Sequence, residues 1–186
     1  MKKSRMTGKL SATLAALALT AGLGLAGGPP ASAAYCGISW GSTVKVVSTY
    51  SSSPITNGHS GRHACFDRMV VDTRWRGAGY RVAYVHQVRQ PGSGFVVPLR
   101  GGARLSVTVL APAYDAYGRA TYRPANRREL VNVTGYSTFR QVALAGSYEG
   151  QTTFGLGVRA RLPMRVMVVQ GPGAGSRVGI DIAHRW

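Results

Sequence analysis

Few side chains in this sequence could support nucleophilic or metal chemistry. The chain has six acidic residues and four histidines. His59 and His63 are four residues apart, a spacing that places two metal ligands on one face of a helix. Their segment, GHSGRH, is rich in glycine, and no third ligand is evident beside it. No Gly-x-Ser-x-Gly motif is present to hold a nucleophilic serine. We therefore expect neither a metal nor another cofactor.

Glycoside cleavage is the next catalytic possibility, because two carboxyl groups placed on either side of a glycosidic bond can cleave it. Asp67, Asp72 and Glu149 are the candidates. Strand alternation sends Asp67 and Arg68 to opposite faces, so Asp67 could instead pair with an arginine of a neighbouring strand. A histidine, a glutamate and an arginine could together cleave RNA, but no such set can be picked out. We name no catalytic residue, and a secreted hydrolase or ribonuclease acting on an acidic polymer stays an alternative.

Arginine dominates the charged side chains. The formal net charge is +17, and loss of a leader containing Lys2, Lys3, Arg5 and Lys9 leaves +13. Guanidinium groups bind phosphate and carboxylate through two parallel hydrogen bonds. Three expected strands each carry a pair of arginines on one face. If these strands are neighbours in a sheet, the pairs form a continuous basic stripe. The alternative is a solvated outer sheet face without a binding role. The candidate anion-binding residues are Arg68 and Arg74, Arg81 and Arg89, and Arg159 and Arg161.

A long exposed loop is expected over Asp115–Arg128, where tyrosines stand among arginines. Aromatic rings of this kind can stack on sugars or bases, with arginines holding the adjacent anionic groups. They can equally fold back over the edge of a sandwich. The candidate loop contacts are Tyr114, Tyr117, Arg119, Tyr122 and Arg123.

The elements that must position these residues are strands, because alternation with a period of two dominates after residue 65. In FDRMVVDTRW, Met69 and Val71 fall on the face opposite Arg68 and Asp72. Similar runs are GYRVAYVHQVR, ARLSVTVLA, TTFGLGVRARL and SRVGIDIAHRW, separated by turns rich in glycine and proline. MRVMVVQ is apolar on both sides and predicts a central strand. The fold class is all-β: a single-domain β-sandwich of short, mainly antiparallel strands with little helix.

Two stretches fit this pattern less well. RRELVNV around Leu130 and STFRQVALA around Val142 could each hold a turn of helix. Residues 37–64 are rich in serine, glycine and threonine, and predict one strand around Val44–Val47.

The N-terminus predicts export. A basic start, an apolar run over Leu10–Ala26 and the small residues Ala31-Ser32-Ala33 describe a signal peptide over residues 1–33, cleaved before Ala34. No later segment is apolar enough to span a membrane. Outside the cytoplasm an isolated cysteine pair usually closes, so Cys36 and Cys65 predict a disulfide. The organisation is therefore a signal peptide, an N-terminal segment 34–54 tied by the disulfide, and one domain over 55–186.

Five blocks in order, GRHACFDRMVVD, GYRVAYV, GSGFVVPLRGGARLSVTV, SYEGQTTFGLGV and RVGIDIAH, give residues 55–184 a family resemblance. Together they resemble the AMIN-like domain of secreted actinobacterial proteins. The resemblance implies an all-β sandwich related to the AMIN modules that target cell-wall amidases and secretins to the envelope, and it implies no activity. The sequence departs from the pattern in having Cys65 before Phe66 and Tyr148 before Glu149-Gly150. The matching motif residues are His63, Phe66, Asp67, Arg68, Glu149, Gly150, Asp181 and His184.

These observations predict a secreted, non-enzymatic envelope domain that associates with an anionic cell-wall polymer, either peptidoglycan or a phosphate-bearing glycopolymer. It would be extracellular, at the cell wall or released from it. Nucleic acid would bind only without sequence specificity, as another polyanion. A protein-interaction or inhibitor module, meeting a secreted partner through the exposed loop, is a further alternative. The sequence does not define the oligomeric state.

Overall fold

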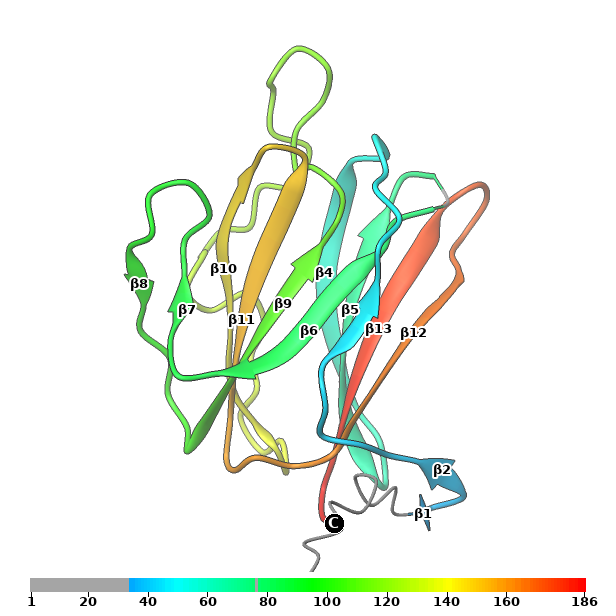
Figure 1. Cartoon of the computed structure of the whole chain (residues 1–186), viewed down its shortest axis with the longest axis vertical. Coiled ribbons are helices and arrows are strands. Elements are labelled where there is room, and N and C mark those ends of the chain that lie inside the picture. Colours follow the sequence, from blue (N-terminus) through cyan, green and yellow to red (C-terminus); the bar gives the residue numbers. More distant parts are fainter. Residues whose placement is uncertain (1–33, 76) are drawn as a thin grey trace, which may run out of the picture.

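The computed structural model describes residues 34–75 and 77–186 and consists of antiparallel strands in two facing sheets (Figure 1). The predicted signal peptide, residues 1–33, lies outside this part. One sheet has the order β10-β11-β9-β6-β3 and the other the order β12-β13-β5-β4, while β1–β2 and β7–β8 form separate hairpins. The described residues contain no helix, which confirms the predicted all-β sandwich. The strands are β1 (Ala34–Tyr35), β2 (Ile38–Ser39), β3 (Lys45–Val47), β4 (Ile55–Arg62), β5 (Phe66–Thr73), β6 (Tyr80–Val85), β7 (Val88–Arg89), β8 (Val96–Val97), β9 (Ala103–Val109), β10 (Phe139–Tyr148), β11 (Gln151–Val158), β12 (Met164–Gln170) and β13 (Ser176–Ala183).

The main core lies between the two sheets and follows the predicted alternation. Along β5 the exposure alternates residue by residue, with Met69 and Val71 fully inside. They pack in one cluster with Leu105 and Phe154 of the facing sheet and Ile180 of β13. Burial of such a continuous apolar layer supplies most of the driving force for folding. The structure has no helix of the length and apolarity needed to cross a bilayer in its described ranges.

The segment around Val142 is a strand, β10, so the expected turn of helix there is wrong. Both faces of β10 are covered: Val142 faces the main core, while Ala143 and Ala145 lie in a second apolar cluster with residues of the β7–β8 hairpin. Because both faces of β10 are buried, apolar residues do not alternate with polar ones in its sequence, and the strand period of two is not visible there. The segment around Leu130 is also not helical; the Leu130 amide donates to the Val142 carbonyl at the outer edge of β10.

The run MRVMVVQ forms β12, an edge strand, and the prediction of a central strand is wrong. Its inner face meets the core through Met164, and its outer face is partly covered by side chains of the same sheet, so both faces are apolar without a strand on both sides. Val168 and Val169 remain 44% and 45% exposed, and on the other sheet the edge strand β3 leaves Val46 half exposed. The sandwich is therefore less well covered along its β3 and β12 edges.

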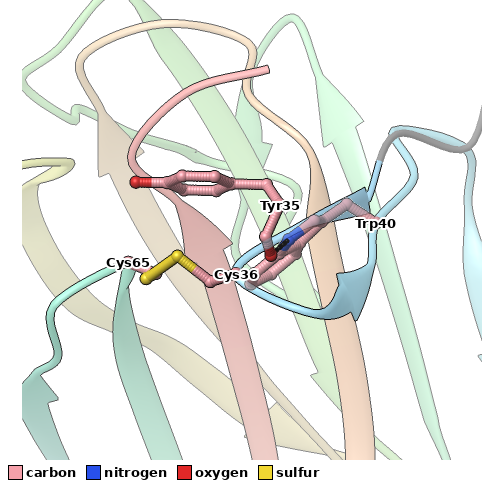
Figure 2. The surroundings of a disulfide bond; sticks show 4 residues. All are labelled: Tyr35, Cys36, Trp40 and Cys65. Atoms are coloured by element: carbon pink, nitrogen blue, oxygen red, sulfur yellow. Dashed lines mark hydrogen bonds between the residues drawn. A yellow bond between two sulfur atoms is a disulfide. The ribbon is translucent and has the colours of Figure 1, made fainter.

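The residues that precede β3 form an N-terminal strap, residues 34–44, held at three points. The predicted disulfide between Cys36 and Cys65 is present (Figure 2). The Trp40 indole donates a hydrogen bond of 2.8 Å to the Tyr35 carbonyl, and its ring packs 5.9 Å from Phe66. Residues 41 and 164 form a β-bridge, so the strap crosses from the four-stranded sheet to β3 of the other sheet.

One glycine of β11 is required by a close backbone approach. A Cβ at Gly157 would lie 1.9 Å from the carbonyl oxygen of Arg100, so Gly157→Ala must displace backbone. We expect it to lower the free energy of unfolding by about 1–3 kcal/mol. Gly61→Ala in β4 is the control, since its Cβ would meet a side chain at an ordinary 3.6 Å. Equal losses in chemical unfolding of the two variants would contradict this reading.

Candidate ligand-binding site

Two of the motif residues form a buried structural clamp between the sheets. Asp67 is fully buried, and its Oδ2 accepts hydrogen bonds from the amides of Thr138 and Phe139 at 2.5 and 3.0 Å. Its Oδ1 lies 3.2 Å from Nε2 of His184. Both oxygens are therefore used to fix the start of β10 to β5 and to the end of the chain. Asp67 is committed to holding the fold together.

Other motif residues lie on the outer face of the same sheet. Asp181 is fully buried and accepts hydrogen bonds from both Arg68 and Arg165, at 2.5–3.1 Å. The bond to Asp181 raises the pKa of Arg68 above its ordinary value. The Phe66 ring lies beneath both guanidinium groups and stacks on His63 at 4.4 Å. These contacts satisfy Arg68, so the arrangement is a cluster that stabilises the sheet.

The catalytic candidates are not brought together. Glu149 and Gly150 form the turn at the far end of β10 from Phe139, and so far from Asp67. Asp72 pairs with Arg177 and His59 on the outer face of the four-stranded sheet. Among the described residues, no three histidines, cysteines or carboxylates gather in a group that could hold a metal ion.

The arginines predicted from strand periodicity are distributed over both sheets. Arg68 and Arg74 belong to β5 or its end, in one sheet, and Arg81 belongs to β6, in the other. Arg89 lies in the β7–β8 hairpin, where it donates to the Gly94 carbonyl. Arg159 and Arg161 lie beyond β11; Arg159 donates to the His184 carbonyl, and Arg161 lies over the Tyr84 ring. The six residues do not line a common hollow among those found in the described chain.

A different basic surface lies along residues 113–140, which pass from the long loop to β10. This segment covers the sandwich edge between β10 and β4: the Thr121 hydroxyl donates to the Ile55 carbonyl, and the Tyr136 hydroxyl bonds with Ser60. Burial against the core raises the pKa of Tyr122 above its ordinary value. The loop therefore does fold back over an edge, as one of the two sequence interpretations held.

Three of the five candidate loop contacts share one hollow. Tyr114, Tyr122 and Arg123 line a cavity of about 420 Å³ together with Pro124 and Arg127. The Tyr114 hydroxyl is fixed by the Gly150 amide at 2.9 Å, and the Tyr122 ring packs on Phe154. A cavity with two aromatic walls and two arginines at its rim has the chemistry to hold an anionic sugar.

The other two loop candidates lie outside that hollow, at the exposed tip. Arg119 packs over the Tyr117 ring and pairs with Asp115 at 2.8 Å. Burial opposes the ionisation of Asp115, but hydrogen bonds from the Arg119 amide and side chain and the Tyr117 amide together lower its pKa. The tip is an internally paired turn.

Two further hollows continue from the first along the same segment. Arg127 and Leu144 also line a second cavity of about 200 Å³, which Arg128 borders. Glu129, the next residue, lines a third cavity of about 610 Å³ with Arg100 and Arg140. We call Arg123, Arg127 and Arg128 the basic flank. Sequence reasoning missed the second and third of these residues, although the run RATYRPANRR concentrates arginines at a spacing of four.

The balance of charges leaves the basic flank unneutralised. Every aspartate and glutamate side chain of the described residues except Glu149 is paired with arginine or histidine. The arginines engaged in those pairs are Arg68, Arg100, Arg119, Arg165 and Arg177, and none of them belongs to the basic flank. The three flank arginines are exposed. Their charge is available to an anion from outside the molecule.

The fold and this surface define an antiparallel β-sandwich domain with an arginine-rich, hollowed flank. The AMIN-like domain family matches residues 53–184, and the chain belongs to this family. This confirms the resemblance seen in the sequence blocks. Comparison with curated proteins and with solved structures gives no match. The family places the chain among modules related to the cell envelope.

Proposed function

We propose that this domain is an exported, non-catalytic envelope module that binds an anionic cell-wall polymer through the basic flank. The observation that carries the proposal is the succession of two hollows that share Arg127, the second of them also lined by Arg128. A linear polymer presents anionic groups at regular intervals, so it can engage successive arginines along one path. Membership of the AMIN-like family supports an envelope location.

The electrostatics support a polymer in preference to an isolated small anion. Exposed guanidinium groups bind a single anion weakly in water, because each ion pair contributes about 0–1 kcal/mol. Several such pairs on one chain act together, and they release counter-ions from the polyanion. Binding of this kind weakens steeply as salt is added. The two tyrosines of the first hollow add contact with the sugar rings that a simple phosphate would lack.

Co-sedimentation with purified sacculi over a series of salt concentrations tests the proposal. We expect the protein to pellet at low salt and to be released as salt rises. The triple variant Arg123→Gln, Arg127→Gln and Arg128→Gln should reduce the slope of log affinity against log salt by about 2–3. It should also lower low-salt affinity at least tenfold.

The matched control removes three exposed arginines from elsewhere, in Arg74→Gln, Arg81→Gln and Arg185→Gln. It changes the net charge equally, so similar losses in both triple variants would show only bulk attraction and would reject a site on the flank. Absence of pelleting at low salt would reject the function itself. Release of soluble fragments from the sacculi would instead assign a hydrolase.

A further inference from the structure

The third hollow, which Arg100, Glu129 and Arg140 line, has a different chemistry from the basic flank. It has a volume of about 610 Å³ and lies where the segment before β10 folds against the start of that strand. Val131, Val133 and Phe139 give it an apolar lining. Arg100, Glu129 and Arg140 supply its charges. An apolar lining with a few charged groups is the usual composition of a site for a small ligand.

The walls of this hollow are fixed without any ligand. The Arg140 guanidinium donates hydrogen bonds to the carbonyl oxygens of Tyr136 and Phe139, at 3.1 and 2.9 Å. Arg100 donates to the Arg140 carbonyl at 3.0 Å. A ligand entering the hollow therefore meets a formed wall and does not have to order it, which favours binding.

Arg100 already holds a carboxylate in this hollow. Its two terminal nitrogens donate to the two oxygens of Glu129, the second at 3.0 Å. This bond raises the pKa of Arg100 above its ordinary value. The side chains are 59% and 36% exposed, and an ion pair so open to water contributes little stability. A carboxylate from another molecule can therefore take the place of Glu129.

We propose that this hollow binds the free C-terminal carboxylate of a short peptide with small apolar side chains. The carboxylate pairs with Arg100 and displaces Glu129, while a methyl side chain rests on Val131 and Val133. Asn132 and Thr134, also on the lining, offer polar groups to the peptide backbone. The ligand and its contacts differ from those of the polymer, so this site does not depend on the proposed function of the basic flank.

Titration of the ¹⁵N-labelled protein with N-acetyl-alanyl-alanine, followed by NMR, tests the site. We expect a dissociation constant on the order of 1 mM, with shifts of the amides of residues 131–135 and of the Arg100 Nε–H. The C-terminal amide of the same peptide should bind about three- to fivefold more weakly, because it lacks the charged acceptor for the exposed Arg100. Equal binding of acid and amide would overturn the proposal.

Two variants separate ligand binding from a structural role. Arg100→Gln should weaken peptide binding about three- to fivefold, since the ion pair it removes is exposed to water. Glu129→Gln should tighten it about two- to fivefold, because the internal competitor for Arg100 is removed. A purely structural pair would give weaker binding in both. Arg104→Gln, on β9 and not on the lining of this hollow, is the control and should change nothing.

The flank triple variant should keep its affinity for the peptide, so loss of polymer binding and loss of peptide binding are distinguishable. Weaker binding in Glu129→Gln would overturn the proposal. A carboxylated sugar that produced these shifts when the peptide did not would overturn the assignment to a peptide.

Discussion

Asp181→Asn is expected to lower the free energy of unfolding by about 2–4 kcal/mol. The side chain of Asp181 is completely buried, and both Arg68 and Arg165 donate to its oxygens. Asparagine keeps the shape but removes the negative charge, which leaves two guanidinium groups facing each other without a counter-ion. Loss of one member of a buried ion pair costs about 3–5 kcal/mol. The two arginines remain about one-third exposed, and water reduces that cost.

The free energy of unfolding of Asp181→Asn is measured in urea, and Asp115→Asn is measured beside it as the control. Asp115 pairs with Arg119 on the exposed loop, and that variant should cost much less stability than Asp181→Asn. In a double-mutant cycle, Asp181→Asn with Arg165→Gln should cost less than the sum of the single changes, because one of the two repelling charges is gone. Strict additivity would show that Arg165 and Asp181 are not coupled.

Removal of the disulfide, in Cys36→Ser with Cys65→Ser, should cost about 3–4 kcal/mol. The bond joins positions 29 residues apart, and a loop of about that length gives this value in the chain-entropy model. The disulfide also anchors the N-terminal strap, which carries Trp40 onto Phe66. Its loss should therefore loosen the packing of Trp40.

Tryptophan fluorescence reports this change directly. Trp40 is 2% exposed, whereas Trp75 and Trp186 are 50% and 58% exposed. A red shift of the emission in the double variant, before global unfolding, must therefore come mainly from Trp40. Trp40→Phe added to the two serine substitutions supplies the control, because it should remove the shift. Unchanged emission together with a stability loss below 1 kcal/mol would show that the strap is held without the disulfide.

Much of the sandwich could be predicted from the sequence, because apolar and polar residues alternate along its strands with a period of two, and this period is visible in the sequence. The faces of Met69 and Val71 and the closure of Cys36 with Cys65 are confirmed. β4 was missed because every residue after Ile55 in the range Ile55–Arg62 is polar or glycine, and its pairing with β5 is what makes it a strand. β10 was obscured because apolar residues stand on both of its faces.

The candidate site was harder to predict, for a physical reason. Arg127 and Arg128 lie in irregular structure, where no period relates a residue to a face. Arg100 and Glu129 are 29 residues apart and meet only through the fold. Sequence patterns report which face of a strand is buried, whereas a hollow between a loop and a sheet edge depends on tertiary packing. The six arginines predicted from strand periodicity are distributed over both sheets, so that prediction did not locate the basic flank.

The uneven covering of the sandwich edges gives the net charge a second role. Residues 113–140 cover the edge beside β10, whereas β12 leaves Val168 and Val169 exposed. An edge of this kind can recruit a strand from another molecule and seed aggregation. The surplus of arginine keeps like molecules apart over a range of about 10 Å at 0.1 M salt. The positive charge that attracts a polyanion thus also opposes self-association through the exposed β12 edge. Added salt screens the charge and therefore weakens both the binding and this protection against aggregation.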